Sequence, residues 1–401
     1  MKVNVYSSSY LDQRFKATAS VTTSASQTLY PFYTACWLIP KSEQAEQLVG
    51  DYEVGRFYTI EQDVMATKLK GELLKGATCF FNQIRSESGL GVLVFEDKFS
   101  LDPLNHDTKT DWTDAPQDKR LSVLADSLGS IGRNAIVVCV STKQAKLYNT
   151  ITDDLRLADS GVNYLKIKIV KNQAEAESEI NTLKQDMEEY AGTLIVLQEK
   201  GELKPDQDLF DYDDRADFVI AGRFLNPYSP TSNSNTYSVG MSLDGTIVNV
   251  KSKNVVYNNS KTNIDLLTQN MLTYFQVRAD DADEILVAGG GVVFQGSVIP
   301  VNFFLLAKYG EYVLKNEMLN AKESSRFGVA NATLVNRAIS ITMTKLEPFR
   351  GVLIDTLIGK SYTQSEVNNM TSNSVLKIPN AIAVTALPVE MYEQITFTIG
   401  L

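Results

Sequence analysis

The order of apolar and polar positions divides much of the chain into strand-like and helix-like segments. From residue 29 to about residue 198, short apolar runs alternate with segments whose apolar residues recur every three or four positions. The runs predict strands at 34–39, 90–95, 135–140, 164–170 and 193–197, and the intervening segments predict helices at 60–84, 119–128, 143–157 and 174–190. Repeated strand–helix units of this size indicate an α/β layer with a largely parallel sheet.

One of these strands carries charge. In residues 164–170, Lys166 and Lys168 alternate with the apolar residues Leu165, Ile167 and Ile169. An alternating pattern is typical of a strand with one face in water. We therefore predict that this strand lies near an edge of the sheet.

The stretch from Glu284 to Asp355 is a packing unit in which a strand pair precedes a helix pair. Two apolar runs, 285–288 and 292–294, flank three glycines, which a tight turn between the strands would explain. Two long helices follow within residues 302–346, and each has an apolar stripe at helical spacing. The stripes consist of Leu305, Tyr309, Tyr312 and Leu319 in the first helix and of Val335, Ile339, Thr342 and Leu346 in the second.

Other segments give shorter predictions. Residues 205–225 and 264–274 have helical patterns, and a hairpin is predicted over 246–257. Thr363 and Glu366 form a capping-box pattern before a short helix. An apolar run at 381–387 predicts a further strand.

Both ends of the chain have strand patterns. Val3 and Val5 alternate with polar residues, after which Ser and Thr dominate up to residue 28, so this arm has little to bury. Residues 395–401 are apolar at every second position. An unpaired strand adds to an exposed sheet edge of another chain. Pairing of both ends within their own chain explains the pattern equally well.

We therefore expect an α/β fold (α+β overall), with a mixed-sheet α/β body, helices packed on it, and strand-forming arms at both ends. The expected divisions are an N-terminal arm (1–27), an α/β domain (28–200), an α+β core domain (201–390) and a C-terminal strand arm (391–401). The length of 401 residues fits two or three domains.

Composition narrows the classes of function. Hydrophobic residues make up 44% of the chain and charged residues 21%, as in ordinary globular proteins. The net charge is −10 and no basic run offsets it, which disfavours nucleic-acid binding. The chain has no apolar signal core and no run long enough to span a membrane, so we expect a soluble protein made in a cytoplasm. The scattered Cys36, Cys79 and Cys139 indicate buried free thiols.

Candidate chemistry is sparse. His106 is the single histidine and lies in a polar loop. Gly359-Lys360-Ser361 lacks the earlier glycine of a phosphate-binding loop, because position 354 is isoleucine. Two acidic clusters lack the pattern of a calcium loop and are better explained as solvated helix faces: Asp206, Asp208, Asp211, Asp213, Asp214 and Asp217, and Asp280, Asp281, Asp283 and Glu284. We expect no cofactor, no metal site, no catalytic residues and no enzyme activity. The rival interpretation is an α/β enzyme that uses Cys139 with a low thiol pKa.

Three phrases resemble those of tailed-phage tail sheath proteins: Gly291-Val292-Val293-Phe294-Gln295-Gly296, Tyr309-Gly310-Glu311-Tyr312-Val313-Leu314 and Phe349-Arg350-Gly351-Val352-Leu353-Ile354. The resemblance covers roughly residues 267–355, and over the first half of the chain it concerns only the architecture.

The resemblance implies a structural virion protein of the phage tail, assembled in the host cytoplasm. Its subunits would stack as hexameric rings around the tail tube, exchange terminal strands with neighbouring subunits, and contract to drive the tube into the host envelope. Besides itself, its partners would be the tail tube, baseplate and neck proteins, with no nucleic acid and no membrane insertion. The compact chain lacks the large outer insertions of bigger sheath proteins, which leaves contraction open. Another self-assembling virion part, such as a tube or connector protein, is the alternative. The exchanged strand arms would be Val3, Asn4, Val5 and Tyr6 at one end and Ile395, Thr396, Phe397, Thr398 and Ile399 at the other.

Overall fold

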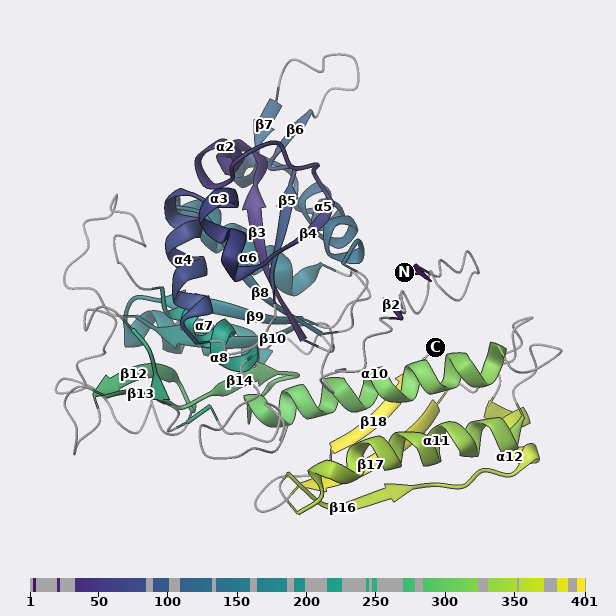
Figure 1. The fold of residues 1–401 in the computed structure, drawn as a ribbon. Coiled ribbons are helices and arrows are strands. Elements are labelled where there is room, and N and C mark those ends of the chain that lie inside the picture. Colours follow the sequence, from purple (N-terminus) through teal and green to yellow (C-terminus); the bar gives the residue numbers. More distant parts are fainter. Residues whose placement is uncertain are drawn as a thin grey trace. The chain divides into compact units, whose positions relative to one another are not determined.

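A computed structural model gives the fold of the chain in two compact units (Figure 1), with the boundary between Asn302 and Phe303. The structure describes residues 3–4, 20–21, 33–83, 89–100, 109–131, 135–158, 164–185, 191–198, 215–225, 243–244, 247–250, 270–277, 284–323, 331–351, 353–370, 381–388 and 395–400.

Unit 1 is built on an 11-stranded mixed sheet, which confirms the predicted α/β body. Its parallel strands lie in the order β5 (Leu90–Phe95), β3 (Tyr33–Pro40), β8 (Ala135–Val140), β9 (Tyr164–Val170), β10 (Ala191–Leu197) and β12 (Thr273–Val277). The antiparallel strands are β4 (Phe57–Ile60) beside β5, then β13 (Ile285–Ala288) and β11 (Ile247–Val248) beyond β12, and the pair β14 (Gly291–Phe294) and β15 (Ser297–Pro300), of which β14 joins β10.

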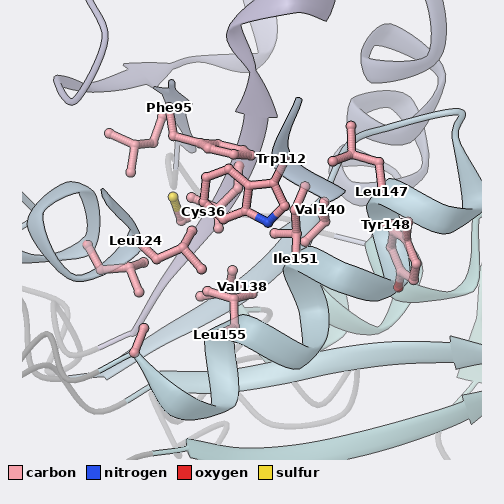
Figure 2. Close-up of a cluster of buried hydrophobic side chains, with 14 of the residues drawn as sticks. Cys36, Phe95, Trp112, Leu124, Val138, Val140, Leu147, Tyr148, Ile151 and Leu155 are labelled. Atoms are coloured by element: carbon pink, nitrogen blue, oxygen red, sulfur yellow. The ribbon is translucent and has the colours of Figure 1, made fainter. Parts of the chain in front are cut away.

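Helices cover both faces of this sheet, as alternate residues of β3 show. Cys36 and Leu38 belong to a cluster with side chains of α5 (Gln117–Gly129) and α6 (Ala145–Leu157), drawn in Figure 2. Trp37 instead packs its ring against Phe80 of α4 (Gly71–Phe81) and Phe218 of α8 (Ala216–Leu225). Because successive residues of a strand point to opposite faces, α5 and α6 cover one face and α4 and α8 the other.

The remaining described elements of unit 1 are short, apart from α7 (Gln173–Gln185), which packs on β9, β10 and β14. They are β1 (Val3–Asn4), β2 (Ser20–Val21), α2 (Gln44–Gln47), α3 (Met65–Lys68), β6 (Lys98–Ser100), β7 (Lys109–Asp111) and the 3₁₀ turns at Lys41–Glu43, Gln62–Val64 and Trp112–Asp114.

The predicted edge position of residues 164–170 is wrong. These residues form β9, which lies between β8 and β10 and is buried along its whole length. Lys168 is 5% exposed, and its Nζ lies 2.8 Å from Asp153 Oδ1 and 2.7 Å from Glu179 Oε2. Two carboxylates from α6 and α7 thus allow a lysine to be buried in a central strand.

The predicted helix over 60–84 is also wrong in extent. It is interrupted before Gly71, where α4 begins with a positive φ of 58°. A Cβ at this position would lie 2.7 Å from the Glu46 carbonyl oxygen, so the glycine allows the two backbone segments to approach. The predicted helix over 264–274 fails at its end, because Thr273 and Tyr274 begin β12, and its start lies outside the described residues.

The strand pair predicted around the three glycines is not a hairpin. β13 pairs with β12 and β11, whereas β14 pairs with β10 and β15. Gly289 and Gly290 have positive φ angles of 84° and 108°, and together they carry the chain from one strand set to the other. In the predicted hairpin over 246–257, residues 247–248 pair with β13 instead, and 251–257 lie outside the described residues.

The domain boundary differs from the expected one at residues 200 and 201. β12, β13 and β14 all come after that point, yet they join the same sheet as β10. Hydrogen bonding between β10 and both β12 and β14 therefore moves the division to Asn302 and Phe303.

Unit 2 contains the predicted helix pair and a three-stranded antiparallel sheet. The helices are α10 (Val301–Glu323), whose first two residues belong to unit 1, and α11 (Ala332–Leu346), followed by a 3₁₀ turn at Glu347–Phe349. The sheet has the order β16 (Ile354–Gly359), β17 (Ala381–Pro388) and β18 (Ile395–Gly400), with α12 (Gln364–Met370) between the first two strands. The predicted stripe of α11 is confirmed, because Val335, Ile339, Thr342 and Leu346 are all buried.

Candidate functional site

The first predicted arm pairs with its own chain in part. Val3 lies opposite Val21, and Asn4 lies opposite Ser20, in an antiparallel two-stranded ladder. Val5 and Tyr6 lie outside the described residues. Two residues of the predicted strand 3–6 are therefore described as a strand, and Val21, the partner of Val3, comes from the same Ser- and Thr-rich arm.

The second predicted arm, Ile395–Ile399, lies in β18 and forms one edge of the unit 2 sheet. All residues of β18 are in register with β17, from Ile395 opposite Ala386 to Gly400 opposite Ala381. Phe397 lies opposite Val384, which is fully buried. The alternating pattern thus predicted a strand correctly, and in this single chain it fills the edge of β17.

The two faces of the unit 2 sheet differ. At Gly359 a Cβ would touch Met343 Sδ and would come within 2.8 Å of Ile339 Cγ2, so α11 lies directly on this face. Ile358, the preceding residue of β16, is 49% exposed. One face is therefore covered by a helix, and the neighbouring residue on the strand reaches solvent.

The sheet also has an unpaired edge. Within the described parts of unit 2, β18 is hydrogen bonded only to β17, so its second edge carries no strand. A free edge exposes backbone N–H and C=O groups that can pair with a strand of another chain. This edge of β18 is thus open to a further strand.

The capping box before α12 is confirmed. The Thr363 backbone N–H donates to Glu366 Oε2 at 2.8 Å, and the Glu366 N–H donates to Thr363 Oγ1 at 3.3 Å. These backbone and side-chain hydrogen bonds, with Lys360 nearby, lower the pKa of Glu366 to about 2. Lys360 also forms an ion pair with Glu366 at 3.0 Å, and Gly359 belongs to a strand, so this segment has no phosphate-loop geometry.

The thiol of Cys139 does not have the low pKa that the enzyme interpretation requires. The residue is fully buried, and burial together with the charge of Asp217 raises the pKa of the thiol. Its Sγ donates to the Asp217 carbonyl oxygen at 3.8 Å. Cys36 and Cys79 are also buried free thiols, as predicted, and burial raises the pKa of Cys36.

One predicted solvated residue is buried instead. Asp217 is 0% exposed, and its two carboxylate oxygens accept hydrogen bonds from Arg215 at 2.6 and 3.1 Å. The guanidinium supplies the counter-charge that makes burial of this carboxylate possible. Arg215 was not among the predicted residues, although an arginine two residues from an aspartate just before an apolar helix was a usable signal. The other members of that cluster, as well as His106 and 280–283, lie outside the described residues.

No helix in the described parts of the chain is long and apolar enough to cross a membrane. The described His, Cys, Asp and Glu side chains form no group of three or more that could hold a metal ion.

Comparison with models of known protein families finds no match, and comparison with curated proteins finds no match either.

Proposed function

We propose that this protein is a structural subunit that polymerises through strand exchange, and that it serves as a tail sheath protein of a tailed phage. The observation that carries the proposal is the edge strand β18, which is in register with β17 along its whole length and has a free second edge within the described residues.

The backbone pairing of β18 with β17 supports strand exchange. The ladder to β17 consists of backbone hydrogen bonds, which do not depend on whether the two strands belong to one chain. The edge of β17, once its own β18 has left it, would therefore accept β18 of a neighbouring subunit in the same register. Exchange of an identical element between copies is a low-cost route to assembly, and a head-to-tail exchange makes rings or helical filaments.

In this proposal the subunits form stacked rings, hexameric by the family resemblance, around a tail tube protein. The arm strands tie neighbouring subunits together while the α/β bodies of unit 1 repack during contraction. The phrases around Gly291, Tyr309 and Phe349 support this assignment over another self-assembling virion part such as a tube or connector.

A designed disulfide tests the exchange directly. Ala383 lies opposite Thr398 in the β17–β18 register, so Ala383→Cys with Thr398→Cys places two thiols at disulfide distance. The three native cysteines are buried, which keeps unwanted cross-linking low. After oxidation of assembled particles, we expect disulfides between chains and a ladder of covalent oligomers on non-reducing gels.

The matched control is Ala383→Cys with Thr396→Cys, which is offset by two residues from the register and should cross-link poorly. Negative-stain electron microscopy of the concentrated protein should show hollow tubes or six-fold rings wide enough to surround a second tube. Particles that contain only intrachain disulfides would rule out exchange of β18. Dispersed monomers at high concentration would contradict the proposed function as a whole.

A further inference from the structure

A buried polar cluster lies at the carboxyl ends of β3 and β8 in unit 1. β3 is followed along the chain by α4 on one face of the sheet, and β8 by α6 on the other face. Adjacent parallel strands whose connections leave to opposite faces define a topological switch point, where open α/β sheets bind their ligands. The cluster therefore occupies the position in this fold at which a ligand site is expected.

Four elements supply its side chains. Glu43 and Gln47 follow β3, Ser141 and Thr142 follow β8, and Glu72 lies in the first turn of α4. Two residues at the start of α8, Arg215 and Asp217, complete the cluster. All seven are less than a tenth exposed.

Hydrogen bonds join these groups into two connected sets. Glu43 accepts from Thr142 Oγ1 at 2.7 Å and from Gln47 Nε2 at 2.8 Å, and Gln47 Nε2 also approaches the Ser141 carbonyl oxygen at 3.3 Å. Arg215 donates to Asp217, to Glu72 Oε1 and, at 2.9 Å, to the carbonyl oxygen of Val140. Because Val140 and Ser141 are consecutive, the two sets meet at the end of β8.

Three oxygen atoms of this cluster have no hydrogen-bond partner among the described residues: Gln47 Oε1, Glu72 Oε2 and Ser141 Oγ. Their side chains are 1%, 6% and 0% exposed, so bulk water does not solvate them. Each belongs to a residue whose other side-chain or carbonyl oxygen or nitrogen atoms are bonded into one of the two sets. Buried polar atoms without a partner are costly, and in native proteins they point to a bound water, ion or ligand.

Carboxyl groups outnumber buried cations in the cluster. Glu43, Glu72 and Asp217 are carboxylic acids, whereas Arg215 is the single buried cation of the cluster, and it is already bound to two of them. An additional positive charge would offset this excess, and it would find oxygen acceptors already in place. An anion or an apolar ligand would gain neither interaction.

We propose that this switch-point cluster binds one small hard cation, of the class of Mg²⁺, Ca²⁺ or K⁺, through Gln47 Oε1, Glu72 Oε2 and Ser141 Oγ. Carboxylate, amide and hydroxyl oxygens are the ligands that such cations and Mn²⁺ take, whereas the later transition metals prefer nitrogen and sulfur. Glu43 adds negative charge beside the ligands without needing to coordinate. The cation would tie the ends of β3 and β8 to the first turn of α4.

The test compares thermal unfolding of the full chain in different salts after chelator treatment and dialysis. We expect Mg²⁺, Ca²⁺ or K⁺ to raise the midpoint of unfolding above that in choline chloride of equal ionic strength, because a ligand that binds only the folded state stabilises it. Binding of Mn²⁺, followed by electron paramagnetic resonance, gives an independent readout for the divalent ions.

Two matched variants localise the effect. Ser141→Ala removes one proposed ligand, so it should weaken cation binding roughly tenfold. It breaks none of the side-chain hydrogen bonds described above, so the variant should still fold. Thr193→Ala is the control, since Thr193 Oγ1 is equally buried and without a partner but belongs to β10. Its cation response should match the native protein.

Two results would overturn the proposal. One is a midpoint that no cation raises beyond choline. The other is an equal cation response of Ser141→Ala and Thr193→Ala, which would leave a single water as the occupant of the cluster. Neither result bears on strand exchange, which the disulfide test addresses separately.

Discussion

Two buried lysines on one strand differ in the carboxylate groups that lie near them. Lys166 and Lys168 are both at most 5% exposed and lie two residues apart on β9. Lys168 has carboxylates at 2.7 and 2.8 Å, whereas Lys166 Nζ has no hydrogen bond to the described residues and lies 3.9 Å from Asp153 Oδ1. Burial, and secondarily the charge of Lys168, lowers the pKa of Lys166 to about 7.

Methionine substitutions at these two positions should have opposite effects at pH 7. Lys166→Met removes a poorly compensated buried amine, so we expect the free energy of unfolding to rise by about 1–3 kcal/mol. Lys168→Met leaves the largely buried Glu179 without its partner, and we expect a loss of about 1–3 kcal/mol. Urea denaturation of both variants measures the difference, and a larger loss for Lys166→Met than for Lys168→Met would contradict this account.

The pH dependence of stability provides a check on the same residue. Lys166 faces Lys168 on its own strand, Asp153 and Arg156 on α6, and Glu179 on α7, with Thr193 opposite it on β10. Its pKa is lower in the folded state than in the unfolded chain, so the folded state binds fewer protons between about pH 7 and 10.5. This residue therefore makes stability rise with pH across that window, and Lys166→Met should lack this rise.

At the scale of the element, the pattern of apolar residues predicted a strand or helix correctly where burial is the main constraint on the residue types. The runs of β3, β5 and β8 are apolar because helices cover both faces of the sheet. At β9 the pattern predicted the strand but gave it the wrong position in the sheet, because the charge of Lys168 is compensated by Asp153 and Glu179 from helices separate in sequence. The candidate site shows the same limit. The pattern of residues 395–399 predicted a strand, but those residues alone do not indicate that the partner is β17, with Val384 opposite Phe397.

The contact between α11 and β16 gives a prediction at this scale. Gly359→Ala would press a methyl group against Met343 and Ile339, so we expect a loss of about 1–3 kcal/mol in stability. Met343→Ala in the same chain should recover part of the loss by removing the nearer side chain. Ile358→Ala, on the adjacent half-exposed position, is the control and should change the melting temperature little. A Gly359→Ala variant as stable as the native chain would show that α11 does not lie on this face.

At the scale of the whole molecule, we propose that the two units have different roles in assembly. Unit 1 holds the 11-stranded sheet and most of the buried side chains, whereas unit 2 holds the strand β18. The division at Asn302 could not be read from residues near 200, because the strands that extend the sheet beyond β10 come much later in the chain.

Removal of residues 395–401 separates assembly from folding. The deletion takes β18 from the unit 2 sheet and leaves every strand of the 11-stranded sheet in place. We expect a chain that retains the thermal transition of unit 1, measured by calorimetry, but that stays monomeric in light scattering. Added peptide with the sequence of 395–401 should bind the vacated edge of β17. A peptide with proline in place of both Thr396 and Phe397 should not, because one of two consecutive N–H groups in an antiparallel strand faces the partner strand. A truncated chain that still forms tubes would show that β18 is not the tie between subunits.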